Sequence, residues 1–191
     1  MDVLRLPTPP QWIDVAMADF SAVLIDHCHC ERKAATSAIA MVNWYPSHEV
    51  LVRRLAKLAQ EELRHFREVH RVIVQRGLTL TRDSGDPYVQ LLLKHVRTPE
   101  AQRRTDRLLV SSLIEARSSE RLQLIADALT GDEELGPFYK ALATAERGHY
   151  KLFVELATLY EDQAVVDARL LELADAEADI VRRLPVEPRI H

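Results

Sequence analysis

The chain has 191 residues, of which 47% are hydrophobic and 28% charged, and its formal net charge is −4. This length supports one well-filled core, so we expect a single domain over residues 1–191. Only five glycines disfavour a turn-rich β fold, and no apolar run approaches the roughly 18 residues of a membrane span. The N-terminus lacks a signal-peptide pattern, and two cysteines are too few for a disulfide framework, so we expect a cytoplasmic protein.

The charge is distributed unevenly along the chain. Residues 53–107 carry thirteen Lys and Arg against seven Asp and Glu, whereas residues 108–191 carry nine against sixteen. A basic middle third suits an anionic partner. A solvated helix face gives the same pattern, and from charge alone it is the simpler interpretation.

Helical periodicity begins near the N-terminus and runs through nearly the whole chain. The first predicted helix spans Trp12–Trp44, with a break near Asp19, and Pro46 ends it. The second long helix takes Ser47 as its N-cap and closes at Gly77. The stretch LTLTRDSGDP then forms a loop.

The second half of the chain repeats this organisation. A short helix over Tyr88–His95 precedes a third long helix, which has Thr98 as its cap and spans Pro99–Leu129. The stretch TGDEELGP opens a fourth long helix that reaches Tyr160, and a last helix covers Ala164–Leu184. These elements predict an all-α fold, a four-helix bundle with one crossover connection and extra short and C-terminal helices.

Apolar residues on the second long helix follow a 4,3,4,3 spacing that marks its inward-facing side: Leu51, Leu55, Leu58, Val69 and Val72. Within the charged stretch KLAQEELRHFREV, this spacing falls on Glu62 and His65, while Glu61 lies beside it. The fourth long helix repeats the pattern, and its spacing falls on Glu146 and His149, each 84 residues after its counterpart. The register therefore selects Glu62 rather than Glu61.

Two further glutamates share a second offset. Glu31 precedes Glu62 by 31 residues, and Glu115 precedes Glu146 by the same number. Both occupy inward-facing positions of their own helices, with small residues one turn to either side: Cys28, Ala35, Ser112 and Ser119. Small neighbours leave room around each carboxylate.

These six residues are costly to bury without a cation. Four carboxylates pointing into one bundle core would repel and lose hydration, at a cost of several kcal/mol each. Two divalent cations would balance the four negative charges, and one imidazole per cation would complete the shell. Oxygen ligands with one nitrogen per metal suit iron or manganese. We therefore predict a di-metal site with these ligands: Glu31, Glu62, His65, Glu115, Glu146 and His149.

The stretch HCHC, from His27 to Cys30, looks like a metal-binding cluster. On one helix, however, its members point in different directions. We interpret Cys28 and Cys30 as packing residues, and Asp26 and His27 as candidate partners of a ligating histidine.

The doubled ligand pattern resembles that of the ferritin-like di-iron superfamily. The stretches HCHCERKAA, LAQEELRHF, LLVSSLIEARSSERL and LATAERGHYKLF are more narrowly similar to the MiaE family. Members of that family are tRNA hydroxylases that act on 2-methylthio-isopentenyladenosine beside the anticodon. The resemblance covers most of the chain and implies a ferritin-like bundle whose six ligands hold two iron ions. It further implies a monooxygenase that uses O2 to hydroxylate the isopentenyl group.

The same resemblance implies two partners. The sequence carries no flavin or nicotinamide motif, so electrons must come from an external reductase. A tRNA substrate would explain the basic residues of segment 53–107, because Lys and Arg bind phosphates without reading sequence. The predicted tRNA contacts are Arg53, Lys57, Arg64 and Arg71 on the second long helix, and Arg103, Arg104 and Arg107 on the third.

Two alternatives belong to other functional classes. The first keeps the metal but makes the protein a ferritin-like peroxidase, a manganese catalase or an iron store. The second is a metal-free helical interaction module. Stoichiometric iron in the purified protein would end the second alternative, and manganese content with peroxide turnover would indicate a catalase.

Overall fold

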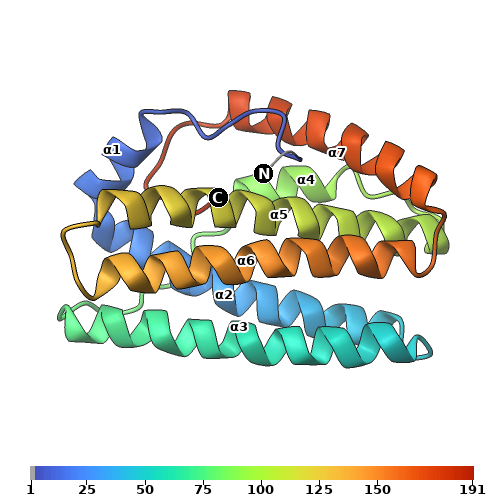
Figure 1. Ribbon diagram of the computed structural model, residues 1–191, viewed down its shortest axis with the longest axis horizontal. Coiled ribbons are helices and arrows are strands. Elements are labelled where there is room, and N and C mark those ends of the chain that lie inside the picture. Colours follow the sequence, from blue (N-terminus) through green and yellow to red (C-terminus); the bar gives the residue numbers. More distant parts are fainter. Residues whose placement is uncertain (1–2) are drawn as a thin grey trace. The chain divides into compact units, whose positions relative to one another are not determined.

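The computed structural model describes residues 3–191, and every regular element in that part of the chain is a helix (Figure 1). The predicted first helix is divided at Asp19 into α1 (Trp12–Ala18) and α2 (Phe20–Trp44), as expected. Asp19 is the N-cap of α2, and its carboxylate accepts a 3.0 Å hydrogen bond from the backbone N–H of Ala22. The all-α prediction is confirmed.

The other helices lie close to their predicted bounds. They are α3 (Glu49–Gln75), α4 (Pro87–Leu93), α5 (Glu100–Ala128), α6 (Leu135–Thr158) and α7 (Gln163–Arg183). The short helix α4 lies in the long connection between α3 and α5, where the crossover was expected. Within residues 3–191, no helix combines the length and the apolar character that a membrane crossing requires.

Two predicted N-caps are wrong by one residue. His48 rather than Ser47 is the N-cap of α3, and Pro99 rather than Thr98 is the N-cap of α5. The backbone N–H of His48 bonds the carbonyl of Tyr45 at 3.1 Å, and this turn carries the start of α3 beyond Ser47. Neither His48 nor Pro99 makes a side-chain capping hydrogen bond, so a pattern of preferred capping residues cannot identify either of them.

The predicted end of α3 at Gly77 is confirmed. Gly77 has a φ of 70°, in the left-handed region that glycine adopts without steric cost. Its N–H bonds the carbonyl of Val74 at 3.0 Å, and the N–H of Leu78 bonds that of Ile73 at 3.0 Å. This pair of bonds is a Schellman motif, which satisfies the last carbonyl groups of the helix.

The chain divides into two compact units, which are described separately. The α2–α3 unit comprises Ala16–Ser84 and Pro188–Ile190. The α5–α6 unit comprises the described residues up to Val15, together with Gly85–Glu187 and His191. The single domain expected for residues 1–191 stays a prediction.

In the α2–α3 unit the two helices form an antiparallel hairpin and lie side by side (Figure 1). The apolar positions predicted to face inward on α3 are all buried: Leu51, Leu55, Leu58, Val69 and Val72. The segment after α3 returns to α2, where Nε2 of His29 donates to the carbonyl of Thr81 at 2.8 Å. Arg32 and Asp83 form an ion pair at 2.7 Å in the same region. These contacts fix the start of the crossover connection on α2.

In the α5–α6 unit the two long helices again lie side by side, and α4 and α7 pack against α5 (Figure 1). Asp106 of α5 is fully buried and accepts hydrogen bonds from Arg97 at 2.7 Å and Arg169 at 3.0 Å. Burial by itself would raise the pKa of Asp106, but the hydrogen bonds from both arginines outweigh it and lower the pKa. Asp106 thereby joins α5 to α7 and to the segment that precedes α5.

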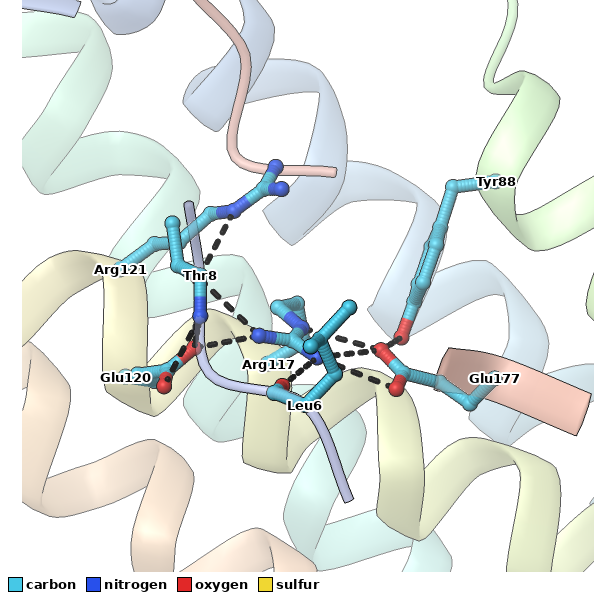
Figure 2. A network of polar contacts seen from close by, with 7 residues as sticks. All are labelled: Leu6, Thr8, Tyr88, Arg117, Glu120, Arg121 and Glu177. Atoms are coloured by element: carbon cyan, nitrogen blue, oxygen red, sulfur yellow. Dashed lines mark hydrogen bonds and ion pairs between the residues drawn. The ribbon is translucent and has the colours of Figure 1, made fainter. Parts of the chain in front are cut away.

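A second polar network lies inside the α5–α6 unit, and the sequence does not predict it (Figure 2). Arg117 of α5 is fully buried and donates to both carboxylate oxygens of Glu177 on α7, at 2.9 and 3.0 Å. Tyr88 donates to Glu177 at 3.0 Å, and burial with the nearby Glu177 charge holds the pKa of Tyr88 well above its ordinary value. Arg117 also bonds Thr8 and the carbonyl of Leu6. The network ties the N-terminal segment and α7 to α5.

Candidate metal centre

Three predicted ligands come together in the α2–α3 unit, and we call them the first triad. They are Glu31 from α2, and Glu62 and His65 from α3. One ligand atom from each lies within 4.8 Å of the others. Nδ1 of His65 is 3.5 Å from Oε2 of Glu31 and 3.6 Å from Oε2 of Glu62. Because Glu62 and His65 are separated by three residues on one helix, both side chains project from the same face.

The α5–α6 unit holds the second triad, which repeats these residue types. Glu115 comes from α5, and Glu146 and His149 come from α6. Their ligand atoms also lie within 4.8 Å of one another, and Nδ1 of His149 is 3.3 Å from Oε2 of Glu146. All three residues are buried, like the apolar positions above and below them on α6: Leu135, Tyr139, Leu142, Phe153 and Leu156.

The structure separates the two adjacent glutamates of α3 as the register predicts. Glu62 has no exposed surface, whereas the Glu61 side chain is 38% exposed. Glu61 lies 3.5 Å from Lys57, one turn earlier on the outer face of the helix. Glu62 therefore belongs to the first triad, and Glu61 belongs to the solvated surface.

The donor set of each triad fits one divalent cation. Two carboxylates carry two negative charges, and their burial without a counter-charge would cost several kcal/mol per group. One divalent cation balances that charge, and a neutral imidazole adds a nitrogen donor without adding charge. Two oxygen ligands with one nitrogen suit iron or manganese.

Two further side chains contact the first triad. Nε2 of His27 donates to Oε1 of Glu31 at 2.7 Å, and both residues are buried. The sequence suggested His27 as a partner of a ligating histidine. It contacts a carboxylate instead, because residues four apart on α2 lie one above the other. A guanidinium nitrogen of Arg64, the residue before His65 on α3, lies 3.0 Å from Nε2 of His65.

Both cysteines of the HCHC stretch are buried, as expected of packing residues. Burial raises the pKa of the Cys28 thiol to about 12, and the charge of Glu31 adds to this effect. Because metals bind the thiolate, such a thiol is a poor ligand. Sγ of Cys30 lies 3.7 Å from the carboxylate of Asp26, which also accepts a 2.8 Å hydrogen bond from the backbone N–H of Ile190. Asp26 therefore anchors the C-terminal segment.

The predicted tRNA contacts differ in their exposure. The exposed members are Arg53, Lys57, Arg64 and Arg71 on α3, and Arg103 on α5. Arg104 and Arg107 are half-buried, and the guanidinium of Arg104 lies over the ring of Tyr160, 4.7 Å from its centre. The α3 side chains are thus accessible to a large anionic ligand, whereas Arg104 is partly engaged in packing.

The full length of the chain, residues 1–191, matches the family model described as tRNA-(MS[2]IO[6]A)-hydroxylase (MiaE). The chain belongs to the MiaE family. A relative from Pseudomonas putida is 40% identical over 189 residues, which cover 98% of this chain and 91% of that protein. A relative from Salmonella typhimurium is 28% identical over 240 residues, covering 100% of this chain and 88% of that protein. Both are named tRNA 2-(methylsulfanyl)-N(6)-isopentenyladenosine(37) hydroxylase.

A solved structure supports the fold class. It is a chain from Synechococcus, described as protein 43 with aldehyde deformylating oxygenase activity, and it matches with a TM-score of 0.93 and 36% identity. The match covers 100% of this chain and 96% of that one. The likeness confirms the ferritin-like bundle predicted for this MiaE-family chain. Family membership favours a hydroxylase over the peroxidase, manganese catalase, iron store and interaction module.

Proposed function

We propose that this MiaE-family protein hydroxylates the isopentenyl group of 2-methylthio-isopentenyladenosine in tRNA. The observation that carries the proposal is a pair of buried Glu, Glu, His triads in a chain whose whole length matches the family. The reaction replaces a C–H bond by C–OH with one oxygen atom of O2. The other oxygen atom leaves as water, after the uptake of two electrons and two protons.

The six triad residues hold a di-iron centre in this proposal, with one triad contributing to each ion. Charge balance supports two divalent ions, because the first and second triads each carry two buried carboxylates. Bound iron supplies the oxidising power that the side chains of the protein lack. Two iron ions per chain in the purified protein would support this assignment, and one or none would contradict it.

Buried apolar side chains next to the ligands exclude water from the site. On α3 the first triad is flanked by Leu58 and Val69, and on α6 the second triad is flanked by Leu142 and Phe153. All four are buried, so apolar groups lie one turn above and below the ligands of each helix. Exclusion of water strengthens electrostatic interactions at the site and protects a reactive oxidant from side reactions.

The tRNA would be held mainly through its phosphates. The exposed basic residues of α3 can bind the backbone by counterion release, and the modified base would be splayed out of the anticodon loop to reach the ions. Electrons would come from an external reductase. We place the reaction in the cytoplasm, where tRNA is modified.

Mass spectrometry of nucleosides from tRNA tests the proposal. Substrate tRNA is incubated with iron-loaded protein, O2 and a reductant, and the hydroxylated nucleoside should appear with the wild type but not with Glu62→Ala. Glu61→Ala is the matched control and should retain activity. Unmodified tRNA after incubation with fully loaded wild-type protein would refute the substrate while leaving the iron assignment standing.

The likeness to the Synechococcus chain favours one second candidate, an oxygenase that acts on an aldehyde. Incubation of the loaded protein with an aldehyde distinguishes the two. Formate release without tRNA hydroxylation would favour the second candidate, whereas turnover of tRNA alone would exclude it.

A further inference from the structure

The buried imidazole of His27 is fixed against one candidate ligand. Its Nε2 atom lies 2.7 Å from Oε1 of Glu31, and only 1% of His27 is exposed. An ionised carboxylate only accepts hydrogen bonds, so Nε2–H of His27 is the donor. The spacing of four residues on α2 brings the ring over the carboxylate without distorting the helix.

The two carboxylate oxygen atoms of Glu31 have different partners. Oε1 is held by His27, while Oε2 lies 3.5 Å from Nδ1 of His65 and therefore points into the first triad. A free glutamate side chain has several rotamers, and only some direct an oxygen atom to an ion. The hydrogen bond from His27 selects one of them before any ion binds.

The second triad does not repeat this imidazole at the matching position of its own helix. Every ligand of the second triad follows its counterpart in the first by 84 residues, so the position that corresponds to His27 is Ser111. Ser111 precedes Glu115 by the same four residues, but its side chain is much shorter than an imidazole. The internal repeat therefore includes the ligand Glu31 but not His27, the residue that contacts it.

We propose that His27 is a positioning residue that holds Glu31 for the ion of the first triad and thereby raises the affinity of that site for its ion. The proposal rests on the proposed function, because it takes the two triads as metal ligands. Side chains that orient metal ligands typically change metal affinity by 10–100-fold when they are removed. We expect an effect of about that size on the first triad and little effect on the second.

Anaerobic titration of the metal-depleted full-length protein with Co(II) tests the proposal through binding alone, without turnover. The wild type should bind two ions in two steps. In His27→Ala one of the two steps should weaken about 10–100-fold while the other stays unchanged. His27→Gln keeps an N–H donor and should weaken that step less than His27→Ala. His29→Gln is the matched control, because His29 is buried two residues away but bonds the carbonyl of Thr81, and both steps should be retained.

A double-variant cycle shows whether His27 acts through Glu31. In a Glu31→Ala background, His27→Ala should cause no further loss, because the carboxylate that it positions is gone. Unchanged binding in His27→Ala, equal weakening of both steps, or an additional loss in the Glu31→Ala background would each overturn the proposal. If His27→Ala does not fold by circular dichroism, wild-type binding constants in a folded His27→Leu, which has no donor, would overturn it. Failure of the wild type to bind two ions would refute the proposed di-iron centre instead.

Discussion

Replacing Glu62 by alanine removes one of the three donors that meet in the first triad. Glu62 is fully buried, with Oε2 3.6 Å from Nδ1 of His65. Residues that only hydrogen-bond to metal ligands already contribute about 10–100-fold to metal affinity. Loss of a direct donor should therefore lower the affinity for one ion at least about 100-fold. Glu61→Ala is an internal control in the neighbouring residue, because Glu61 is part of an exposed ion pair with Lys57.

The expected effect on stability follows from mass action. At a free metal concentration of 100 times the wild-type Kd, binding stabilises the wild type by about 2.7 kcal/mol for that ion. With a Kd raised about 100-fold, the same concentration stabilises Glu62→Ala by only about 0.4 kcal/mol. For a protein of this size, about 1 kcal/mol corresponds to about 2–4 °C in Tm. The metal-induced rise in Tm should therefore be about 5–9 °C smaller in Glu62→Ala.

The assay is thermal unfolding with and without Fe(II) under anaerobic conditions, followed by circular dichroism. Comparing the shift within each variant removes the effect of the substitution on packing. Glu61→Ala should show the wild-type shift, because an exposed ion pair contributes at most about 1 kcal/mol and none of it to metal binding. An equal shift in Glu62→Ala and wild type, or a lost shift in Glu61→Ala, would refute the register argument.

Three further predictions concern the basic surface of α3, the buried carboxylate of Asp106 and two glycines. Reversing the charge of Lys57 and Arg71 to Glu should weaken tRNA binding and reduce its salt dependence, measured by filter binding at several salt concentrations; unchanged affinity and slope would place the tRNA elsewhere. The lowered pKa of Asp106 contributes stability above the unfolded value of about 3.9, and this contribution is lost as pH falls through the folded pKa. Urea unfolding should therefore show a destabilisation by Asp106→Asn that is large at pH 7 and shrinks with acidification, and a pH-independent difference would contradict this reasoning. Gly77→Ala should lower Tm by about 2–4 °C, because alanine in the left-handed region costs about 1 kcal/mol, whereas Gly148→Ala inside α6 should raise it. Equal Tm changes in the two glycine variants would contradict the assigned backbone conformations.

The sequence by itself determines the helices and the six candidate ligands. A bundle helix has one inward-facing stripe, so a charged residue on that stripe is anomalous in the one-dimensional pattern. The repeat resolves the ambiguity between the adjacent glutamates of α3, because Ala145 stands where Glu61 would be repeated, while Glu146 is kept. Burial of all six residues agrees with this register.

Only the tertiary structure decides which polar side chains on the helices have partners far along the chain. Arg117 and Glu177 are separated by 60 residues, and Asp106 and Arg169 by 63. A charged residue within a helix is ordinarily assigned to solvent, because periodicity contains no information about the charge on a neighbouring helix. His27 shows the same limit over a short distance, because its four-residue spacing allows a contact with Glu31 that only side-chain geometry establishes. Periodicity thus gives the direction in which a residue faces, whereas the packing of the helices selects the atom that it contacts.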